Sequence, residues 1–240
     1  MEGEKKRARV RDTMKALLTE TDSVALHAYT PASGLPSLRA AIAADLQSRL
    51  AAPVSQERLY VCCGKDAGLA AACRALLAPG EEAVALAPAP EELRIYVEAA
   101  GGELRVVPAA AVTRESVSGS TRLVILDTAA LPETELAPML DALRAAQARV
   151  GHPIYLLAVE PYGSAPALCA YENTVACFPF AEALAMPGER LACLAVSERA
   201  AGSADVFDRI AGASRAMGYV NTPSLMQRVL ERCLDLAAET

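Results

Sequence analysis

The chain has 240 residues, a formal net charge of −6 at pH 7 and 53% hydrophobic residues. This acidic balance lacks the basic face that nucleic-acid binding requires, so we expect no nucleic-acid partner. The charged start MEGEKKRARV lacks the apolar segment of a signal peptide, and no apolar stretch approaches the ~20 residues that span a bilayer. We therefore expect a cytoplasmic protein without a membrane partner. The basic run from Lys5 to Arg11 is interpreted as the solvated start of a helix.

Short apolar runs alternate with helical patterns along the chain. The runs read as strands that are buried on both faces, as in parallel sheets. They are Leu59–Cys63, Ala83–Ala87, Leu104–Val107, Leu123–Leu126, Ile154–Val159, Thr174–Phe178 and Leu191–Val196. Helices are predicted over residues 36–50, 67–80, 133–151, 203–218 and 224–238, with prolines or glycines at their ends.

This alternation predicts one α/β domain that spans residues 1–240. We expect three layers, α/β/α, around a mostly parallel sheet of about seven strands.

Cysteine and histidine give no sign of a disulfide framework or a metal site. Seven cysteines form an odd set without CxxC spacing, and several of them fall inside the predicted strands. Buried free thiols in a reducing compartment are the favoured interpretation. The two histidines, His27 and His152, lie at element entries without a partner at metal-ligand spacing, so no metal is expected.

Several segments, in order, match motifs of one enzyme family. HAYTPASGLPSLR, which starts at His27, is similar to Y-x-P-x-x-G-x-P-x-L-R. The stretch that starts at Cys62, CCGKDAGLAAACRALLAPGEEAVALAPAP, resembles a glycine loop, helix, PGD-x-V strand and P-x-Y turn. IYLLAVEPY resembles a DEPY strand, and PFAEALAMPGER resembles SxSK-x-x-x-x-PGER. With the segment 214–235, the chain from about Val10 onward resembles the fold-type I, class I/II aminotransferases, which depend on pyridoxal phosphate (PLP).

The resemblance implies the large, PLP-binding-type domain of that family. The family's small domain, which carries the arginine that grips the substrate α-carboxylate, has no counterpart in this sequence. We therefore expect the small domain to be largely missing.

Five positions that carry the family's PLP chemistry are changed. The Schiff-base lysine is replaced by Glu182, and a carboxylate cannot form an imine. Val159 stands where an acidic residue pairs with the pyridine nitrogen, and Leu131 where an asparagine bonds the ring hydroxyl. Pro90 replaces the aromatic that stacks on the ring, and Pro179 replaces the phosphate-binding serine. Together these changes indicate a site that has been filled in.

Other family positions survive and are the candidate cofactor-binding residues. By resemblance, Tyr162 would bond the ring oxygen, Arg190 would hold the phosphate, and Tyr29 would reach a partner subunit's phosphate. Gly64 and Lys65 open the glycine loop, where helix N–H groups could hold an anion. Structural alternatives remain open, because Tyr162 could cap its strand and Arg190 could pair with a nearby carboxylate.

The glycine loop also carries Asp66, which would repel a phosphate. Two like unit charges 4 Å apart repel by about 4 kcal/mol at an effective dielectric of 20. Arg190 could pair with Glu189 or Asp66. Lys65 is the lysine nearest the expected pocket, but we expect it at the phosphate end, far from the aldehyde. No catalytic residue is assigned.

The sequence thus predicts a catalytically inactive aminotransferase-like pseudoenzyme that acts as an interaction or regulatory module. A homodimer, or a heterodimer with a related protein, is expected. No cofactor is expected, and PLP enters by family resemblance alone. Three alternatives stay open: non-covalent binding of PLP or another phosphorylated ligand, an active transaminase with an unusual site, and a simplified fold without a ligand.

Overall fold

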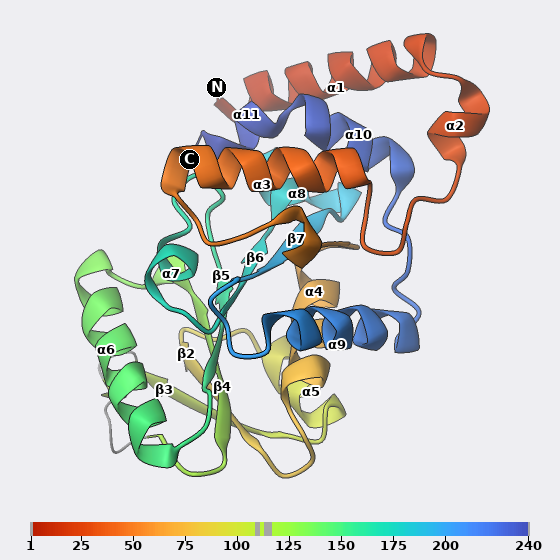
Figure 1. Cartoon of the computed structure of the whole chain (residues 1–240). Helices are drawn as coiled ribbons and strands as arrows, with labels where there is room; N and C mark the ends of the chain where they lie inside the picture. Colours follow the sequence, from red (N-terminus) through yellow and green to blue (C-terminus); the bar gives the residue numbers. More distant parts are fainter. Residues whose placement is uncertain (1, 109–110, 113–116, 240) are drawn as a thin grey trace.

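The computed structural model describes residues 2–108, 111–112 and 117–239. In this part of the chain seven strands form one sheet, in the order β1-β7-β6-β5-β4-β2-β3 (Figure 1). The strands are β1 (Leu59–Cys62), β2 (Glu82–Ala87), β3 (Glu103–Pro108), β4 (Thr121–Asp127), β5 (Tyr155–Val159), β6 (Thr174–Phe178) and β7 (Ala192–Val196). β7 runs antiparallel to both of its neighbours, and the pairs from β6 to β3 are parallel.

Helices cover both faces of this sheet. They are α1 (Glu2–Glu20), α2 (Ser23–His27), α3 (Pro36–Leu50), α4 (Lys65–Leu76), α5 (Glu92–Ala99), α6 (Glu133–Val150), α7 (Pro166–Ala170), α8 (Phe180–Ala183), α9 (Ser203–Ala216), α10 (Ser224–Arg232) and α11 (Leu234–Ala238). Short 3₁₀ turns stand at Gln56–Arg58, Thr128–Ala130 and Pro187–Glu189. The predicted three-layer α/β/α architecture, with a mostly parallel sheet of seven strands, is confirmed.

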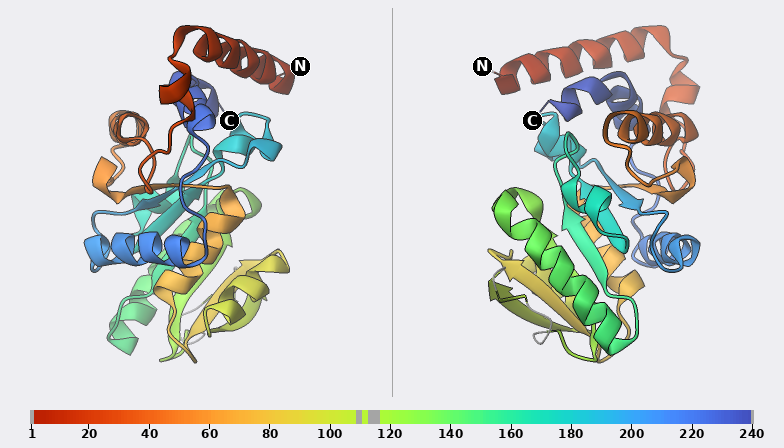
Figure 2. Two further views of the ribbon diagram at one scale, coloured as in Figure 1. Left: turned by 90° about the vertical axis from the view of Figure 1, so that its right-hand side faces the viewer. Right: turned by 60° about the vertical axis from the view of Figure 1, so that its left-hand side comes forward.

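The sheet separates distinct apolar clusters. On one face, α4, α5 and α9 pack through side chains such as Leu69, Val97 and Ile210. On the other face, α6 and α7 cover β4 and β5. Next to them, α3, α8 and α10 cover the end of the sheet formed by β1, β7 and β6 (Figures 1 and 2). The strands are therefore covered on both sides, which explains their nearly continuous apolar runs.

All five predicted helices are present, and two of them differ clearly from the expected limits. Residues 224–238 were expected to form one helix, whereas α10 ends at Arg232 and α11 begins at Leu234. Between them Cys233 has φ −123° and ψ 20°, outside the helical region, and its side chain is fully buried. The helix expected over 67–80 begins earlier, at Lys65, and ends at Leu76, because Pro79 disfavours the helical conformation before it.

α1 forms an outer layer beyond α10 (Figures 1 and 2). Val10 and Leu17 are buried toward the body of the protein, and Arg232 on α10 pairs with Glu20 at 3.0 Å. Of the basic run, Lys5, Arg7, Arg9 and Arg11 are exposed, as a solvated helix start requires. Lys6 differs, because it is only 8% exposed and its ammonium group donates hydrogen bonds to the backbone carbonyls of Ala183 and Glu239.

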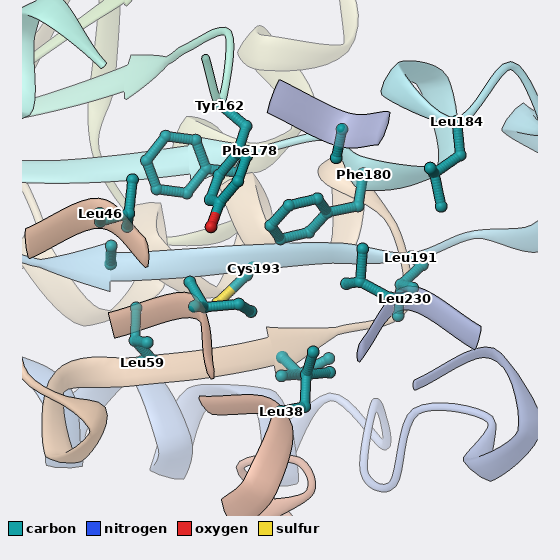
Figure 3. Packing of buried hydrophobic residues seen from close by; sticks show 14 of the residues in the cluster. Leu38, Leu46, Leu59, Tyr162, Phe178, Phe180, Leu184, Leu191, Cys193 and Leu230 are labelled. Atoms are coloured by element: carbon teal, nitrogen blue, oxygen red, sulfur yellow. The ribbon is translucent and has the colours of Figure 1, made fainter. Parts of the chain in front are cut away.

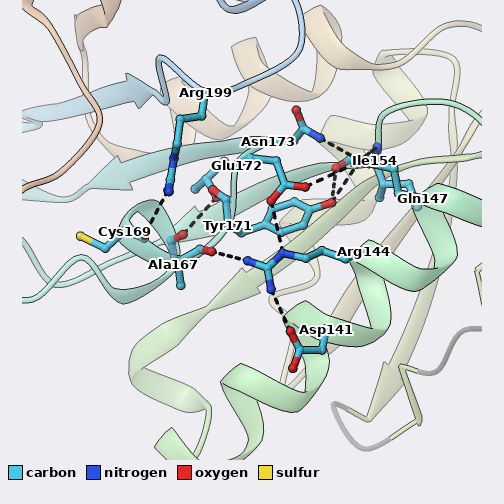
Figure 4. Close-up of polar contacts among 12 residues, drawn as sticks. Asp141, Arg144, Gln147, Ile154, Ala167, Cys169, Tyr171, Glu172, Asn173 and Arg199 are labelled. Carbon is cyan, nitrogen blue, oxygen red and sulfur yellow. Dashed lines mark hydrogen bonds and ion pairs between the residues drawn. The ribbon is translucent and has the colours of Figure 1, made fainter.

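A polar network fastens α6 to the connection between β5 and β6 (Figure 4). Arg144 pairs with Asp141 at 2.9 Å and lies 5.7 Å from the ring centroid of Tyr171. The Tyr171 hydroxyl donates to the carbonyl of Ile154 at 2.9 Å, and Asn173 donates to Gln147 at 2.7 Å. These bonds satisfy polar groups that would be costly to bury alone.

The seven cysteines are all free thiols, as expected. Five of them are buried: Cys62, Cys73, Cys177, Cys193 and Cys233. Burial raises the pKa of the Cys73 thiol to about 12, so this group stays protonated and behaves as a small apolar side chain.

Candidate functional site

Two adjoining cavities open where several parallel strands end. The larger, of about 540 Å³, lies between the carboxyl ends of β2, β4 and β5 and the first turns of α4 and α5. The smaller, of about 290 Å³, lies between the ends of β4 and β5 and the start of α8. Lys65, Asp127 and Val159 line both cavities. In open α/β sheets, ligands bind in crevices at this edge, so these cavities are the candidate site.

The glycine loop turns into α4 beside Arg190. Gly64 has φ +89°, a conformation that favours glycine, and α4 begins at Lys65. A Cβ atom at Gly64 would stand 2.9–3.0 Å from atoms of the Arg190 guanidinium group, so this group lies directly against the loop. The missing side chain of Gly64 thereby makes room for Arg190.

Asp66 is the ionic partner of Arg190. The Nη2 atom of Arg190 donates to Oδ2 of Asp66 at 2.6 Å, and both side chains are about half exposed. The hydrogen bond with Asp66 raises the pKa of Arg190, which stays charged. Of the two partners considered from the sequence, Glu189 and Asp66, the structure selects Asp66.

Lys65 and Glu182 line the same smaller cavity. We expected Lys65 at the phosphate end of the pocket, and it lines both cavities, the smaller one together with Glu182. Neither the Lys65 side chain nor the Glu182 side chain forms a hydrogen bond or an ion pair with the residues that the structure describes. The first turn of α4 and the short helix α8 bring them together, because both begin at the same edge of the sheet.

Tyr162 is packed into the core. Its side chain is 1% exposed and its ring lies against Phe178 and Phe180, with centroid distances of 5.4 and 4.9 Å (Figure 3). The guanidinium carbon of Arg49 lies 5.2 Å from the ring centroid. The hydroxyl lies within range of Asp45 and Arg49 on α3 but forms no hydrogen bond with good geometry in the described structure, and burial raises its pKa.

Glu160 is the most deeply buried carboxyl group at this edge. It is 1% exposed, lines the smaller cavity, and accepts hydrogen bonds from the backbone N–H groups of Ala167 and Leu168 at 2.6 and 3.0 Å. These bonds hold the start of α7. Burial raises the pKa of Glu160 to about 7, and the two N–H groups oppose this rise.

Tyr29 lines neither cavity of the site. It is 92% exposed and lies in a separate hollow with Leu26, Thr222 and Leu225. The structure therefore places Gly64 against Arg190 and brings Lys65 and Tyr162 to the wall of the smaller cavity, whereas Tyr29 lies in a different hollow.

Three cavity residues were not singled out in the sequence. Asp127 ends β4, and its Oδ1 accepts a hydrogen bond from the N–H of Ala129 at 2.9 Å. Glu92 and Tyr96 lie one turn apart on α5 and both line the larger cavity. An acidic residue that closes an apolar strand was a usable signal for Asp127, whereas α5 itself was not predicted. Pro90 and Pro179 do line the larger and the smaller cavity, respectively.

The described residues contain no group of three or more His, Cys, Asp or Glu side chains placed to hold a metal ion. In the same part of the chain, none of the helices has the length and apolar character needed to cross a lipid bilayer.

Comparison with known proteins gives one consistent result. A family model described as aminotransferase class I and II matches residues 1–118. A probable aspartate/prephenate aminotransferase of Thermus aquaticus is 28% identical over 181 residues, which cover 68% of this chain and 47% of the relative. The aspartate/prephenate aminotransferase of Thermus thermophilus is 28% identical over 182 residues, with the same coverage. The chain spans about half the length of these curated relatives.

Solved structures give the same picture over nearly the whole chain. An aminotransferase from Eubacterium rectale superposes with a TM-score of 0.87 and 32% identity, over 94% of this chain and 63% of that one. An aspartate aminotransferase of Thermus thermophilus has a TM-score of 0.76 and 21% identity, over 97% and 63% of the two chains. At that lower identity the second likeness concerns the fold.

Proposed function

We propose that this chain is an aminotransferase-family protein of the class I and II type that has no transaminase activity of its own. We propose further that residues 1–240 act as one unit, an interaction or regulatory module in the cytoplasm. The observation that carries the proposal is Glu182, at the family's lysine position on α8 and on the wall of the smaller cavity. A carboxylate cannot condense with an aldehyde, so the covalent step of PLP chemistry lacks its amine there.

The other positions around the cavities do not supply what PLP needs. Val159, at the end of β5, gives no charge to a pyridine nitrogen, and Pro90 gives no aromatic face for stacking. The Tyr162 ring is packed against Phe178 and Phe180, so its hydroxyl lies in the core rather than free for a ring oxygen. These surroundings favour apolar contacts over those of a charged cofactor ring.

The phosphate end is equally unsuited. Arg190, the family's phosphate-binding arginine, is bound to Asp66 at 2.6 Å. A phosphate would have to displace this carboxylate and then bear its negative charge at short range. The residues present therefore do not fit PLP, and we derive no reaction step through it.

The interaction role rests on exposed apolar side chains. Leu18, Val24 and Tyr29, at the end of α1 and around α2, are 57%, 79% and 92% exposed. A second copy of this chain, or a related aminotransferase-family protein, would cover them. Light scattering tests this part of the proposal, since a monomer at micromolar concentration would contradict the homodimer.

A second candidate is non-covalent binding of a phosphorylated ligand at Gly64, Lys65 and Arg190. It is favoured by the free ammonium group of Lys65, which forms no ion pair with the described residues. Tyr162 lines the smaller cavity together with Lys65, whereas Tyr29 would take part only through a partner subunit.

One experiment separates these functions. The protein is titrated with PLP while its absorption spectrum is followed, then reduced with borohydride and analysed by mass spectrometry. We expect no spectral shift and no reduced adduct. A saturable shift without an adduct would instead support the second candidate. A reducible adduct that is lost in Lys65→Arg would overturn the proposal, because Lys65 would then form the covalent bond with PLP in place of the family's lysine.

A further inference from the structure

The larger cavity has the size and walls of a small-molecule site. Its volume of about 540 Å³ falls within the usual range for ligand pockets. Leu69, Leu86, Leu93 and Ile125 supply apolar walls from four different elements. Pro90 stands where the family resemblance places an aromatic, and the smaller ring leaves this volume open. An apolar ligand body of one aromatic ring with a short chain matches these walls.

The charges around the cavities are unequal. Counted over both cavities and the partner of Asp66, two groups are positive and four are negative, and a fifth carboxyl group, Glu160, has a pKa of about 7. The positive groups are Lys65 and Arg190, and the negative groups are Asp66, Glu92, Asp127 and Glu182. An anionic ligand would add to this excess, whereas a monocation would reduce it.

The partners of each charged group show where the excess of negative charge lies. Arg190 offsets Asp66 at 2.6 Å. Lys65 and Asp127 line both cavities, and the carboxyl groups of Glu160 and Glu182 line the smaller one. Glu92 remains, on the wall of the larger cavity, without a hydrogen bond or an ion pair among the described residues.

Tyr96 lies beside Glu92. The two residues are four positions apart on α5, a spacing that places them on one face of the helix, and both line the larger cavity. Burial, together with the charges of Asp66 and Glu92, raises the pKa of Tyr96, so its ring remains a neutral phenol. The face of such a ring attracts an organic cation, and a carboxylate next to it strengthens the attraction.

We propose that the larger cavity binds a primary amine with an apolar body. Its ammonium group sits between the Glu92 carboxylate and the Tyr96 ring, and its apolar part lies against Leu86, Leu93 and Ile125. No bond is made or broken. The proposal goes beyond the function proposed above, because it needs neither PLP nor a partner protein.

The test uses the full chain and two probes that differ in charge. The probes are 2-phenylethylamine and 3-phenylpropionate, titrated without PLP by calorimetry or ligand-observed NMR. We expect saturable binding of the amine, at least tenfold tighter than binding of the carboxylate. Equal binding of the two probes, or no saturable binding of the amine, would overturn the proposal.

Variants then test the location. Glu92→Gln should weaken amine binding about tenfold, and Tyr96→Leu should also weaken it. Glu91→Gln is the matched control, because Glu91 precedes Glu92 but does not line the cavity. All three positions are solvent-accessible, so we expect the variants to fold, and thermal unfolding checks this. Amine binding that is unchanged in Glu92→Gln, or that falls equally in Glu91→Gln, would refute this site. The PLP titration, which tests the proposed function, is read by absorbance and by a reduced adduct. Its result is therefore independent of the amine titration, which tests this inference.

Discussion

Replacing Asp66 should turn the start of α4 into an anion site. In Asp66→Ser the Arg190 guanidinium loses its partner at 2.6 Å, while the N–H groups of the first turn of α4 stay in place. A serine side chain can also donate to an anion. We therefore expect the variant to bind inorganic phosphate more tightly than the unmodified protein.

The magnitude follows from the charge that is removed. A phosphate on Arg190 would stand about 4 Å from the Asp66 carboxylate, and each pair of unit charges at that distance repels by about 4 kcal/mol at a dielectric of 20. Both side chains are about half exposed, at 49% and 43%, so solvent screens most of this energy. We expect about 1.4 kcal/mol, which is roughly a tenfold tighter dissociation constant. Loss of the exposed ion pair should lower the free energy of unfolding by less than about 1 kcal/mol.

The assay is a phosphate titration followed by calorimetry or ³¹P NMR at low salt. Glu189→Gln is the control, since it removes one negative charge next to Arg190 in the sequence but not its ionic partner. The double variant Asp66→Ser with Arg190→Gln should lose the added affinity. If Asp66→Ser binds phosphate no better than the unmodified protein, or if Glu189→Gln shows the same increase, the account of Asp66 is refuted.

Three further predictions concern buried groups and the glycine loop. Glu160 has a folded-state pKa of about 7 against an ordinary value of 4.5, so its contribution to stability should fall by about 3 kcal/mol as the pH rises from 4.5 to 7. Glu160→Gln should remove this difference between the free energies of unfolding in urea at pH 4.5 and pH 8. The same change between the two pH values in both proteins would contradict the prediction. Tyr162→Phe should change the free energy of unfolding by less than about 1 kcal/mol, because the buried hydroxyl lacks a well-formed hydrogen bond in the described structure, and a loss above about 2 kcal/mol would show that it has one. Gly64→Ala should cost more than Gly80→Ala in thermal unfolding: both glycines have positive φ, but only the Cβ at Gly64 meets a close neighbour, 2.9 Å away on Arg190. Equal costs would mean that backbone strain alone decides.

The fold could be predicted because its signals are local. Each strand is a short apolar run, and most of the long helices are bounded by prolines or glycines that fix their ends. The break at Cys233 could not be predicted, since the pattern of residues 224–238 is helical throughout and the interruption accompanies burial of this side chain. The antiparallel direction of β7 could not be predicted either, because an apolar run does not indicate in which direction its strand lies in the sheet.

The candidate site was only partly predictable. The sequence offered Asp66 as one of two partners for Arg190, but the geometry of the glycine loop decides between them. Tyr162 has the same motif context as in the family, yet its surroundings depend on Phe178 and Phe180. Glu92 and Tyr96 carry no motif, and they become a pair only when α5 forms next to the carboxyl ends of β2 and β4.

The position of β1 has a consequence for how the chain reaches its native state. β1 is an edge strand and pairs with β7, so Leu59 cannot pair with Ala195 until β7 has been synthesised. During synthesis the amino-terminal quarter of the chain emerges long before its partner strand, whereas β2, β4, β5 and β6 can pair in the order in which they emerge, with β3 added at the edge. We therefore expect the apolar side of α3, which packs in one cluster with β1 and β7, to stay exposed on the nascent chain until β7 is synthesised.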